Sequence, residues 1–302
     1  MKVFVTGSSG FIGSALVRDL TDEGHIVTPL VRSSSGGEGV RWDPEAGNMD
    51  VDGLEGFDAA VHLAGENIAG AAWTPERKAR IRNSRVKGTR LLCESLHRLD
   101  RPPETLVCAS AVGFYGDRGR EVLREESPPG KGFLSDVCRE WEAATGEAAR
   151  KGIRVVNLRI GMVVSSSGGA LAKMLPPFKA GAGGRIGSGE QYMSWIALPD
   201  LVGVIRYALT AGFLEGPVNA VAPHAVTNRE FTKTLGRVLG RPTLVPLPAF
   251  AARLLFGEMA DELLLASAHV EPGKLLASGY VFRFPELDGA LRHVLEKSGS
   301  KR

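Results

Sequence analysis

The chain has 302 residues, of which 43% are hydrophobic and 24% charged, and its formal net charge at pH 7 is +3. This is the composition of an ordinary globular protein. The chain is long enough for one large α/β domain or for a main domain with a smaller lobe. So small a net charge argues against a nucleic-acid partner, and the lack of any long apolar run argues against a membrane span.

Strands and helices alternate through the first half of the sequence. Short β-branched runs that end in small residues predict strands, and longer runs with apolar residues at helical spacing predict the helices between them. The expected strands are residues 2–6, 25–32, 57–65, 105–111 and 153–161, and the expected helices are 11–24, 75–99 and 133–151. This alternation predicts the α/β class, with a Rossmann-type doubly wound parallel sheet.

The alternation stops after the last of these strands. Residues 165–191 are rich in Gly and Pro, and we expect them to form a loop and short helix that cover a ligand. Residues 217–223 are expected to return to the sheet, before the helices of a smaller C-terminal lobe. We therefore divide the chain into a main cofactor-binding domain of residues 1–160, to which 195–222 return, and a smaller substrate lobe of residues 161–302.

The cysteines and the amino terminus indicate a cytoplasmic protein. Cys93, Cys108 and Cys138 have neither a CxxC spacing nor neighbours that suggest metal ligands, so we expect reduced thiols and no metal site. In the opening residues MKVFVTGSSGFIG, Gly and Ser interrupt the apolar run too early for a signal peptide.

A glycine-rich loop follows the first strand. In VTGSSGFIG, three glycines form a G-x-x-G-x-x-G pattern between a strand and a helix, the context in which such a pattern predicts dinucleotide binding. The helix amino terminus offers free N–H groups and a partial positive charge to a pyrophosphate. The expected cofactor contacts here are Gly7, Ser9, Gly10, Phe11, Ile12 and Gly13. A glycine-rich turn that binds nothing is the alternative.

The end of the second strand discriminates between the two nicotinamide cofactors. NAD(H) usually meets an Asp or Glu at this place, but the strand ends in LVRSSSGG, with Arg32 and no acid. A guanidinium binds phosphate oxygens bidentately, so Arg32 favours the 2′-phosphate of NADP(H). The alternative is a solvated arginine at a strand end.

Five segments of the chain carry a family resemblance. They are TGSSGFIG, DAAVHLAGENI (58–68), SAVGFYGD (110–117), LRIGMVVSSSGGAL (158–171) and GSGEQYMSWIALPDLV (187–202). Together they resemble the atypical extended short-chain dehydrogenase/reductases, in the NAD(P)-dependent epimerase branch that has a small C-terminal domain, here near residues 245–295. Some members of that branch carry a cell-division-inhibitor label.

The resemblance implies further site residues. Arg85 matches a cofactor contact, and Met162 lies in the segment that matches the strand end beneath the nicotinamide. Ser110 matches the Ser or Thr that hydrogen-bonds a substrate oxygen. The residues that match the strand end on the adenosine and ribose side are Leu63, Ala64 and Gly65.

The same comparison shows that a catalytic pair is missing. Most of the superfamily has a Tyr that moves the substrate proton and, one helical turn later, a Lys that assists it. In FLSDVCREWE these two places hold Leu134 and Cys138, which supply neither the proton nor the fixed charge. Tyr115, in GFYGD, is our candidate substitute, with Cys138 and Tyr192 as further candidates.

The sequence leaves three functions open. The first is an NADP(H)-dependent oxidoreductase that acts on a small carbonyl or hydroxyl substrate, with Ser110 polarising it. The second is an epimerase or dehydratase acting on a sugar nucleotide, and the third is a non-catalytic NADP(H)-binding sensor or partner protein. The resemblance also implies a homodimer formed through the helices at 75–99 and 133–151.

Overall fold

The computed structural model describes residues 1–32 and 38–299, and its largest element is an eight-stranded sheet in the order β12-β8-β6-β5-β1-β2-β3-β4. The strands are β1 Lys2–Thr6, β2 Ile26–Arg32, β3 Val40–Asp43, β4 Asn48–Met49, β5 Ala59–His62, β6 Thr105–Ala111, β8 Arg154–Ile160 and β12 Gly216–Ala220. β1 runs parallel to both of its neighbours, β2 and β5, whereas β4 pairs antiparallel with β3. The predicted α/β class with a Rossmann-type sheet is confirmed.

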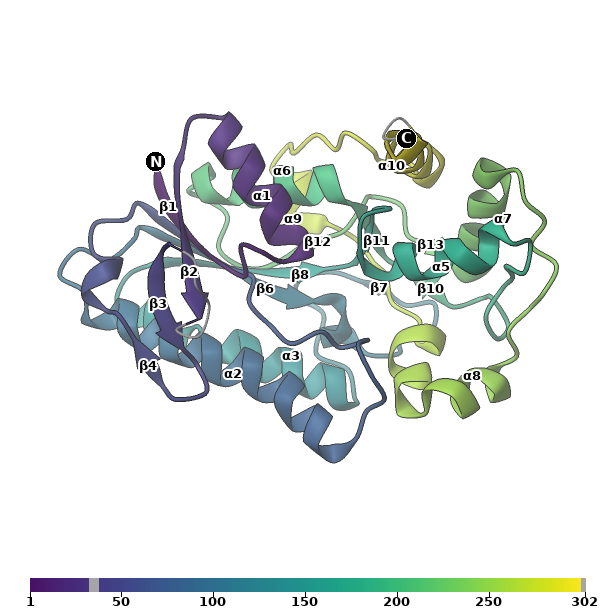
Figure 1. The fold of residues 1–302 in the computed structure, drawn as a ribbon, viewed down its shortest axis with the longest axis horizontal. Coiled ribbons are helices and arrows are strands. Elements are labelled where there is room, and N and C mark those ends of the chain that lie inside the picture. The colour runs from purple at the N-terminus through teal and green to yellow at the C-terminus, as the bar shows by residue number, and fades with distance from the viewer. Residues whose placement is uncertain (33–37, 300–302) are drawn as a thin grey trace. The chain divides into compact units, whose positions relative to one another are not determined.

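The chain winds in two directions from the middle of this sheet. After β1 it adds β2 and β3 on one side, and then it returns to add β5 and β6 on the other. Helices α1 Phe11–Asp22 and α2 Pro75–Arg98 lie on opposite faces of the sheet (Figure 1). The carboxyl ends of β1 and β5 therefore lie side by side at a topological switch point, which is where doubly wound sheets bind their ligands.

The central strands are buried on both faces. Val3, Phe4 and Val5 of β1 have no exposed surface, and all of β5 is buried. Because helices cover both sides of the sheet, each strand needs apolar residues on both faces, which explains the unbroken apolar runs in the sequence. Burial of one large side chain such as Phe4 contributes about 1.5–3 kcal/mol.

The helix expected over 133–151 is two helices in the structure. α3 spans Phe133–Ala143 and α4 spans Gly146–Arg150. Between them, the Thr145 hydroxyl donates a hydrogen bond to the Glu142 carbonyl oxygen at 2.7 Å. A side chain that bonds a nearby backbone group competes with the helical pattern, which explains the interruption.

The chain divides into two compact units. The first comprises Met1–Ser110, Val137–Leu158 and Val202–Pro217, and the second comprises Ala111–Asp136, Arg159–Leu201 and Val218–Arg302. Helices α3 and α6, Leu198–Thr210, and strands β8 and β12 have residues in both. The division into a cofactor domain and a substrate lobe at residue 160 stays a prediction.

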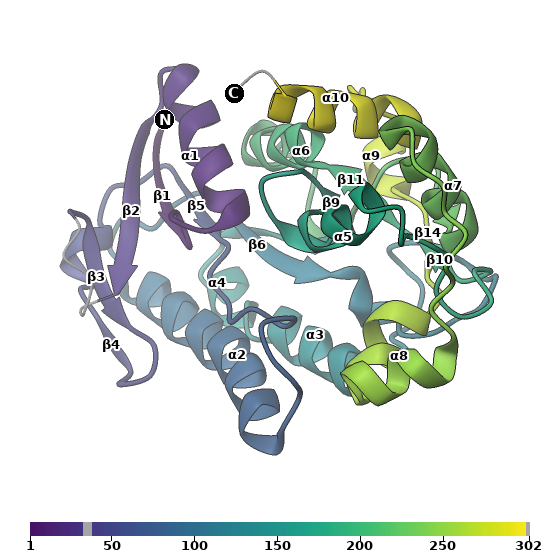
Figure 2. The ribbon, with the colours of Figure 1, turned by 45° about the vertical axis from the view of Figure 1, so that its right-hand side comes forward.

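The second unit is built from short elements around its own apolar core. They are β7 Val122–Leu123, β9 Met162–Val164, α5 Gly169–Lys179, β10 Tyr192–Met193, β11 Trp195–Ala197, β13 Val226–Thr227, α7 Asn228–Leu239, α8 Ala249–Phe256, β14 His269–Val270, α9 Gly273–Ala277 and α10 Leu287–Gly299. Figure 2 shows α5, α7 and α10 around β9 and β11, where Trp195, Phe231 and Leu291 are buried together. None of the helices in the described ranges combines the length and hydropathy that a membrane crossing requires.

Candidate active site

The glycine loop after β1 is packed too closely for side chains. Gly7 has a φ of +67°, and a Cβ there would lie 2.9 Å from the carbonyl carbon of Leu63. A Cβ at Gly13 would lie only 2.1 Å from the Gly7 carbonyl oxygen. The first glycine therefore permits the turn, and the third allows α1 to start directly against the loop.

Helix α1 begins without a side-chain cap. Its N-cap is Gly10, which has no side chain to accept an N–H, and the first turn contains no acidic residue. The first N–H groups of a helix have no partner within the helix and carry the positive end of its dipole. The local sequence thus leaves this helix end suited to an anion such as a pyrophosphate.

The strand end beside this loop is held by side chains from β1 and β5. The Thr6 hydroxyl accepts hydrogen bonds from the backbone N–H groups of Leu63 and Ala64, both at 3.1 Å. The same hydroxyl lies 2.7 Å from Nδ1 of the buried His62. The predicted contacts Leu63 and Ala64 therefore have fixed backbone positions next to Gly7.

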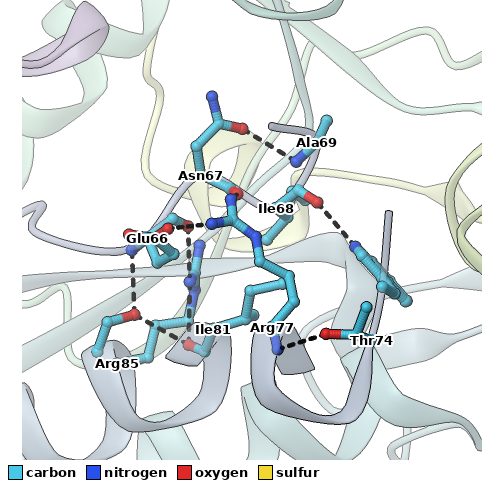
Figure 3. A network of polar contacts seen from close by, with 10 residues as sticks. Glu66, Asn67, Ile68, Ala69, Thr74, Arg77, Ile81 and Arg85 are labelled. Carbon is cyan, nitrogen blue, oxygen red and sulfur yellow. Dashed lines mark hydrogen bonds and ion pairs between the residues drawn. The ribbon is translucent and has the colours of Figure 1, made fainter. Parts of the chain in front are cut away.

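Arg85 approaches the same strand end from α2. Its Nη1 donates to the carbonyl oxygens of Glu66, at 3.0 Å, and Ile81, at 3.2 Å (Figure 3). A Cβ added at Gly65 would lie 3.3 Å from the guanidinium carbon of Arg85, which itself sits 5.1 Å from the centre of the Trp141 ring. Arg85 is thus held between the predicted contact Gly65 and helix α3.

Glu66, which interacts with the charge of Arg85, forms its ion pair with another arginine. The carboxylate of Glu66 pairs with Arg77, which also donates to the carbonyl oxygen of Asn67 (Figure 3). Burial lowers the pKa of Arg85, while Cys138 and Glu66 raise it. A guanidinium keeps its charge in proteins, so a half-buried cation lies against the loop that follows β5.

Ser110 lies near the carboxyl end of β6 and contacts an acid from α3. Its hydroxyl donates a hydrogen bond to Oε1 of Glu142 at 2.7 Å. Ser110 is 2% exposed, whereas Glu142 is half-buried. The two places where the resemblance puts Tyr and Lys, Leu134 and Cys138, are both buried.

Tyr115 belongs to the second unit and is fully buried there. Its hydroxyl lies 2.7 Å from Oδ1 of Asn219 and 2.9 Å from the carbonyl oxygen of Arg124, and it accepts a hydrogen bond from Arg159 at 2.9 Å. Burial raises the Tyr115 pKa. These contacts occupy the hydroxyl and do not favour Tyr115 as the proton donor. The catalytic assignment of Tyr115 stays a prediction.

The structure groups most of the predicted site residues. The glycine loop, Arg85, Ser110 and the segment after β5 all belong to the first unit, at or beside the carboxyl ends of β1, β5 and β6. Arg32 ends the adjacent strand β2 and is exposed. Met162 begins β9 in the second unit, where its N–H donates to the Ser194 carbonyl oxygen. The contacts of these residues with a cofactor stay predictions.

Two family models match the chain. One is described as the NAD dependent epimerase/dehydratase family and matches residues 3–220. The chain belongs to this epimerase/dehydratase family. The second, a domain of unknown function called DUF1731, matches residues 247–294. The epimerase-family resemblance and the small C-terminal domain near 245–295 that the sequence predicts are confirmed.

Members of the epimerase/dehydratase family match the chain over its whole length. An epimerase family protein of Mycobacterium bovis is 42% identical over 298 residues, which are 98% of each chain. The human epimerase family protein SDR39U1 is 39% identical over 301 residues, 98% of this chain and 100% of its own. The crystal structure of human SDR39U1 (isoform 2) with NADPH matches with a TM-score of 0.90 at 38% identity, over 98% of this chain and 99% of that one.

The residues present fit the dinucleotide of the epimerase/dehydratase family. The space at Gly7 and Gly13 admits no Cβ, and the α1 amino terminus has no side-chain cap. The close packing at the two glycines brings the start of α1 directly against the loop, and the missing cap leaves the first N–H groups of the helix available to phosphate oxygens.

Sequence reasoning missed two residues of this site. Glu142 follows Leu134 and Cys138 at the same four-residue spacing, so it lies one turn beyond the places of the Tyr and the Lys. That spacing is a signal that could have found it. Thr6 gives no such signal, because it appears only as the last residue of a buried strand.

Proposed function

We propose that this protein is an NADP(H)-dependent oxidoreductase that acts on a small carbonyl or hydroxyl substrate. Family membership and the NADPH-bound human relative support the cofactor. The observation that carries the proposal is the hydrogen bond of 2.7 Å between Ser110 and Glu142. It gives the chain a polar group beside the strand ends that hold the glycine loop, although the usual Tyr and Lys are absent.

The chain's own residues divide the binding of the cofactor between them. The glycine loop and the α1 amino terminus would hold the pyrophosphate, and Arg32 would bind the 2′-phosphate of NADP(H). The backbone from Leu63 to Gly65 would line the adenosine and ribose side, and Arg85, which lies near Cys138, would add a positive charge on the nicotinamide side. When bound, the cofactor supplies or accepts a hydride.

Ser110 would act on the substrate oxygen. A hydroxyl that donates a hydrogen bond to a carbonyl oxygen stabilises the negative charge that develops there during reduction. In the reverse direction the same hydroxyl would accept the proton of a substrate alcohol. Leu134 has no proton to transfer, and the proposal assigns no step to the buried thiol of Cys138.

The cofactor is tested first, by calorimetric titration with NADPH and NADH. We expect NADPH to bind more tightly than NADH, and Arg32→Ala to remove most of that preference while NADH binding is unchanged. Equal affinity for both cofactors in the wild type would contradict the assignment of NADP(H), and binding of neither would overturn the whole proposal.

Turnover is tested next, with purified protein, NADPH and a panel of aldehydes, ketones and quinones. We expect Ser110→Ala to reduce turnover strongly without a change in NADPH affinity. Ser95→Ala is the matched control, because Ser95 is a buried serine of the same unit whose hydroxyl bonds the Leu91 carbonyl oxygen. A wild type that binds NADPH but reduces nothing in the panel would favour the sensor, and one that never exchanges its cofactor would favour the epimerase.

A further inference from the structure

Glu142 lies one helical turn beyond Cys138, the place where the resemblance puts the family's Lys. Residues four apart are neighbours on one face of a helix, so Leu134, Cys138 and Glu142 form a row along α3. Of these three, only Glu142 carries a carboxyl group. Oε1 of Glu142 lies 2.7 Å from the Ser110 hydroxyl, an ordinary hydrogen-bond distance between two oxygens, so a proton can pass between the two groups.

The burial of the two residues suits a proton path. Ser110 is 2% exposed, so its hydroxyl is shielded from bulk water, whereas Glu142 is half-buried and keeps part of its surface in water. The pair therefore connects a buried hydroxyl with the solvent through one carboxyl group.

Two of the three thiols do not compete for this role. Burial raises the pKa of Cys93 to about 12 and that of Cys108 well above its ordinary value. Both thiols consequently keep their protons at neutral pH and cannot cycle between two protonation states. Glu142 is also close enough to Cys108 to raise its pKa further by charge repulsion.

We infer that Glu142 is the proton reservoir of the reaction and acts through Ser110. In the reducing direction, the carbonyl carbon would take a hydride from bound NADPH, which is oxidised to NADP⁺, while the carbonyl oxygen takes the hydroxyl proton of Ser110. Ser110 regains a proton from the carboxylic acid of Glu142, which is left as a carboxylate and is reprotonated from water. In the oxidising direction each proton moves the opposite way. The inference rests on the proposed oxidoreductase function.

Glu142→Gln tests proton transfer by Glu142 while its hydrogen bond with Ser110 is kept. An amide can still accept the Ser110 hydrogen bond, but it cannot hold or release the proton. We expect kcat for reduction of phenanthrenequinone or the best aldehyde of the panel to fall about 100-fold or more, as for loss of a general acid. The affinity for NADPH should stay unchanged. Glu140→Gln is the matched control, since Glu140 is on the same helix and pairs with Arg82 instead, and it should keep full activity.

Three further variants distinguish proton supply by Glu142 from a role in packing alone. We expect Glu142→Ala to lose activity and to recover part of it when formate is added, because formate can fill the vacated space and carry the proton. Ser110→Ala should not recover in formate. Glu142→Asp should keep intermediate activity.

The outcomes are distinguishable. If Glu142→Gln turns over like the wild type, or if formate rescues nothing, Glu142 has no part in proton transfer and the inference is wrong, while the proposed oxidoreductase stands. If the wild type reduces no carbonyl compound at all, the proposed function falls, and this inference falls with it.

Discussion

The Thr6 hydroxyl lies 2.7 Å from Nδ1 of His62, and together the two residues link the ends of β1 and β5. Thr6 already accepts two N–H groups from the following segment, so its single proton is donated to Nδ1 of His62. The proton of the imidazole is then on Nε2, which lies 2.9 Å from the Thr89 hydroxyl on α2. A neutral histidine thus ties two strands and a helix together beneath the predicted cofactor contacts.

The stability of the fold should depend on this histidine in acid. Burial lowers the pKa of His62 from 6.5 to about 4, so between these values the unfolded chain binds a proton that the folded chain rejects. The stabilisation is complete above pH 6.5 and is lost as the pH falls towards 4, by about 3 kcal/mol at most. Denaturant unfolding of the wild type and His62→Gln across this range should show the wild type losing more stability. His97→Gln, at a half-exposed histidine of α2, should follow the wild type.

Arg85 should act on a different part of the cofactor from Arg32. It is placed between Gly65 and helix α3, and it interacts with Cys138, the place where the resemblance puts the Lys. We expect Arg85→Ala to weaken NADPH binding about 10- to 100-fold, the range for loss of charged hydrogen bonds. Binding of 2′,5′-ADP, which lacks the nicotinamide half, should stay unchanged.

Arg32→Ala is the counterpart to this variant, and it should weaken the binding of 2′,5′-ADP and of NADPH alike. Calorimetry with both ligands on both variants provides the comparison. Equal losses of 2′,5′-ADP affinity in the two variants would show that Arg85 contacts the adenosine half.

The close packing of Gly13 against Gly7 should leave no room for even one methyl group. In Gly13→Ala the new Cβ would overlap the Gly7 carbonyl oxygen, and neither backbone can move without opening the loop. We expect NADPH binding to be lost, with a lower melting temperature. Gly212→Ala is the control, because a Cβ there meets nothing within 4 Å. Normal NADPH affinity in Gly13→Ala would mean that the loop does not hold the cofactor.

Tyr115 should prove to be a structural residue. Tyr115→Phe leaves Oδ1 of Asn219 without its hydrogen bond, which destabilises a protein by about 1–3 kcal/mol when the group is buried. We expect a lower melting temperature and nearly unchanged turnover per folded molecule. A large fall in kcat with unaltered stability would contradict this expectation and would restore Tyr115 as the proton donor.

Some features of this protein can be predicted almost completely from its amino-acid sequence. The strand–glycine–helix pattern around Gly7, Gly10 and Gly13 is local, because it depends only on which residues can adopt a tight turn and start a helix next to it. The parallel sheet is also predictable, since strands buried on both faces need unbroken apolar runs. The break between α3 and α4 is not predictable in this way. It involves a hydroxyl that bonds the carbonyl oxygen of a residue three positions earlier, and composition alone does not show whether that bond or the helix prevails.

The pairing of Ser110 with Glu142 was decided only by tertiary structure. These residues are 32 positions apart, and whether they meet depends on how α3 is rotated about its axis when it packs beside β6. The same is true of Thr6 and His62, which lie 56 positions apart on neighbouring strands. Local residue preferences determine strands, turns and helix ends, but a hydrogen bond of 2.7 Å between distant elements depends on packing around the whole core, because close-packed interiors fix side-chain positions collectively.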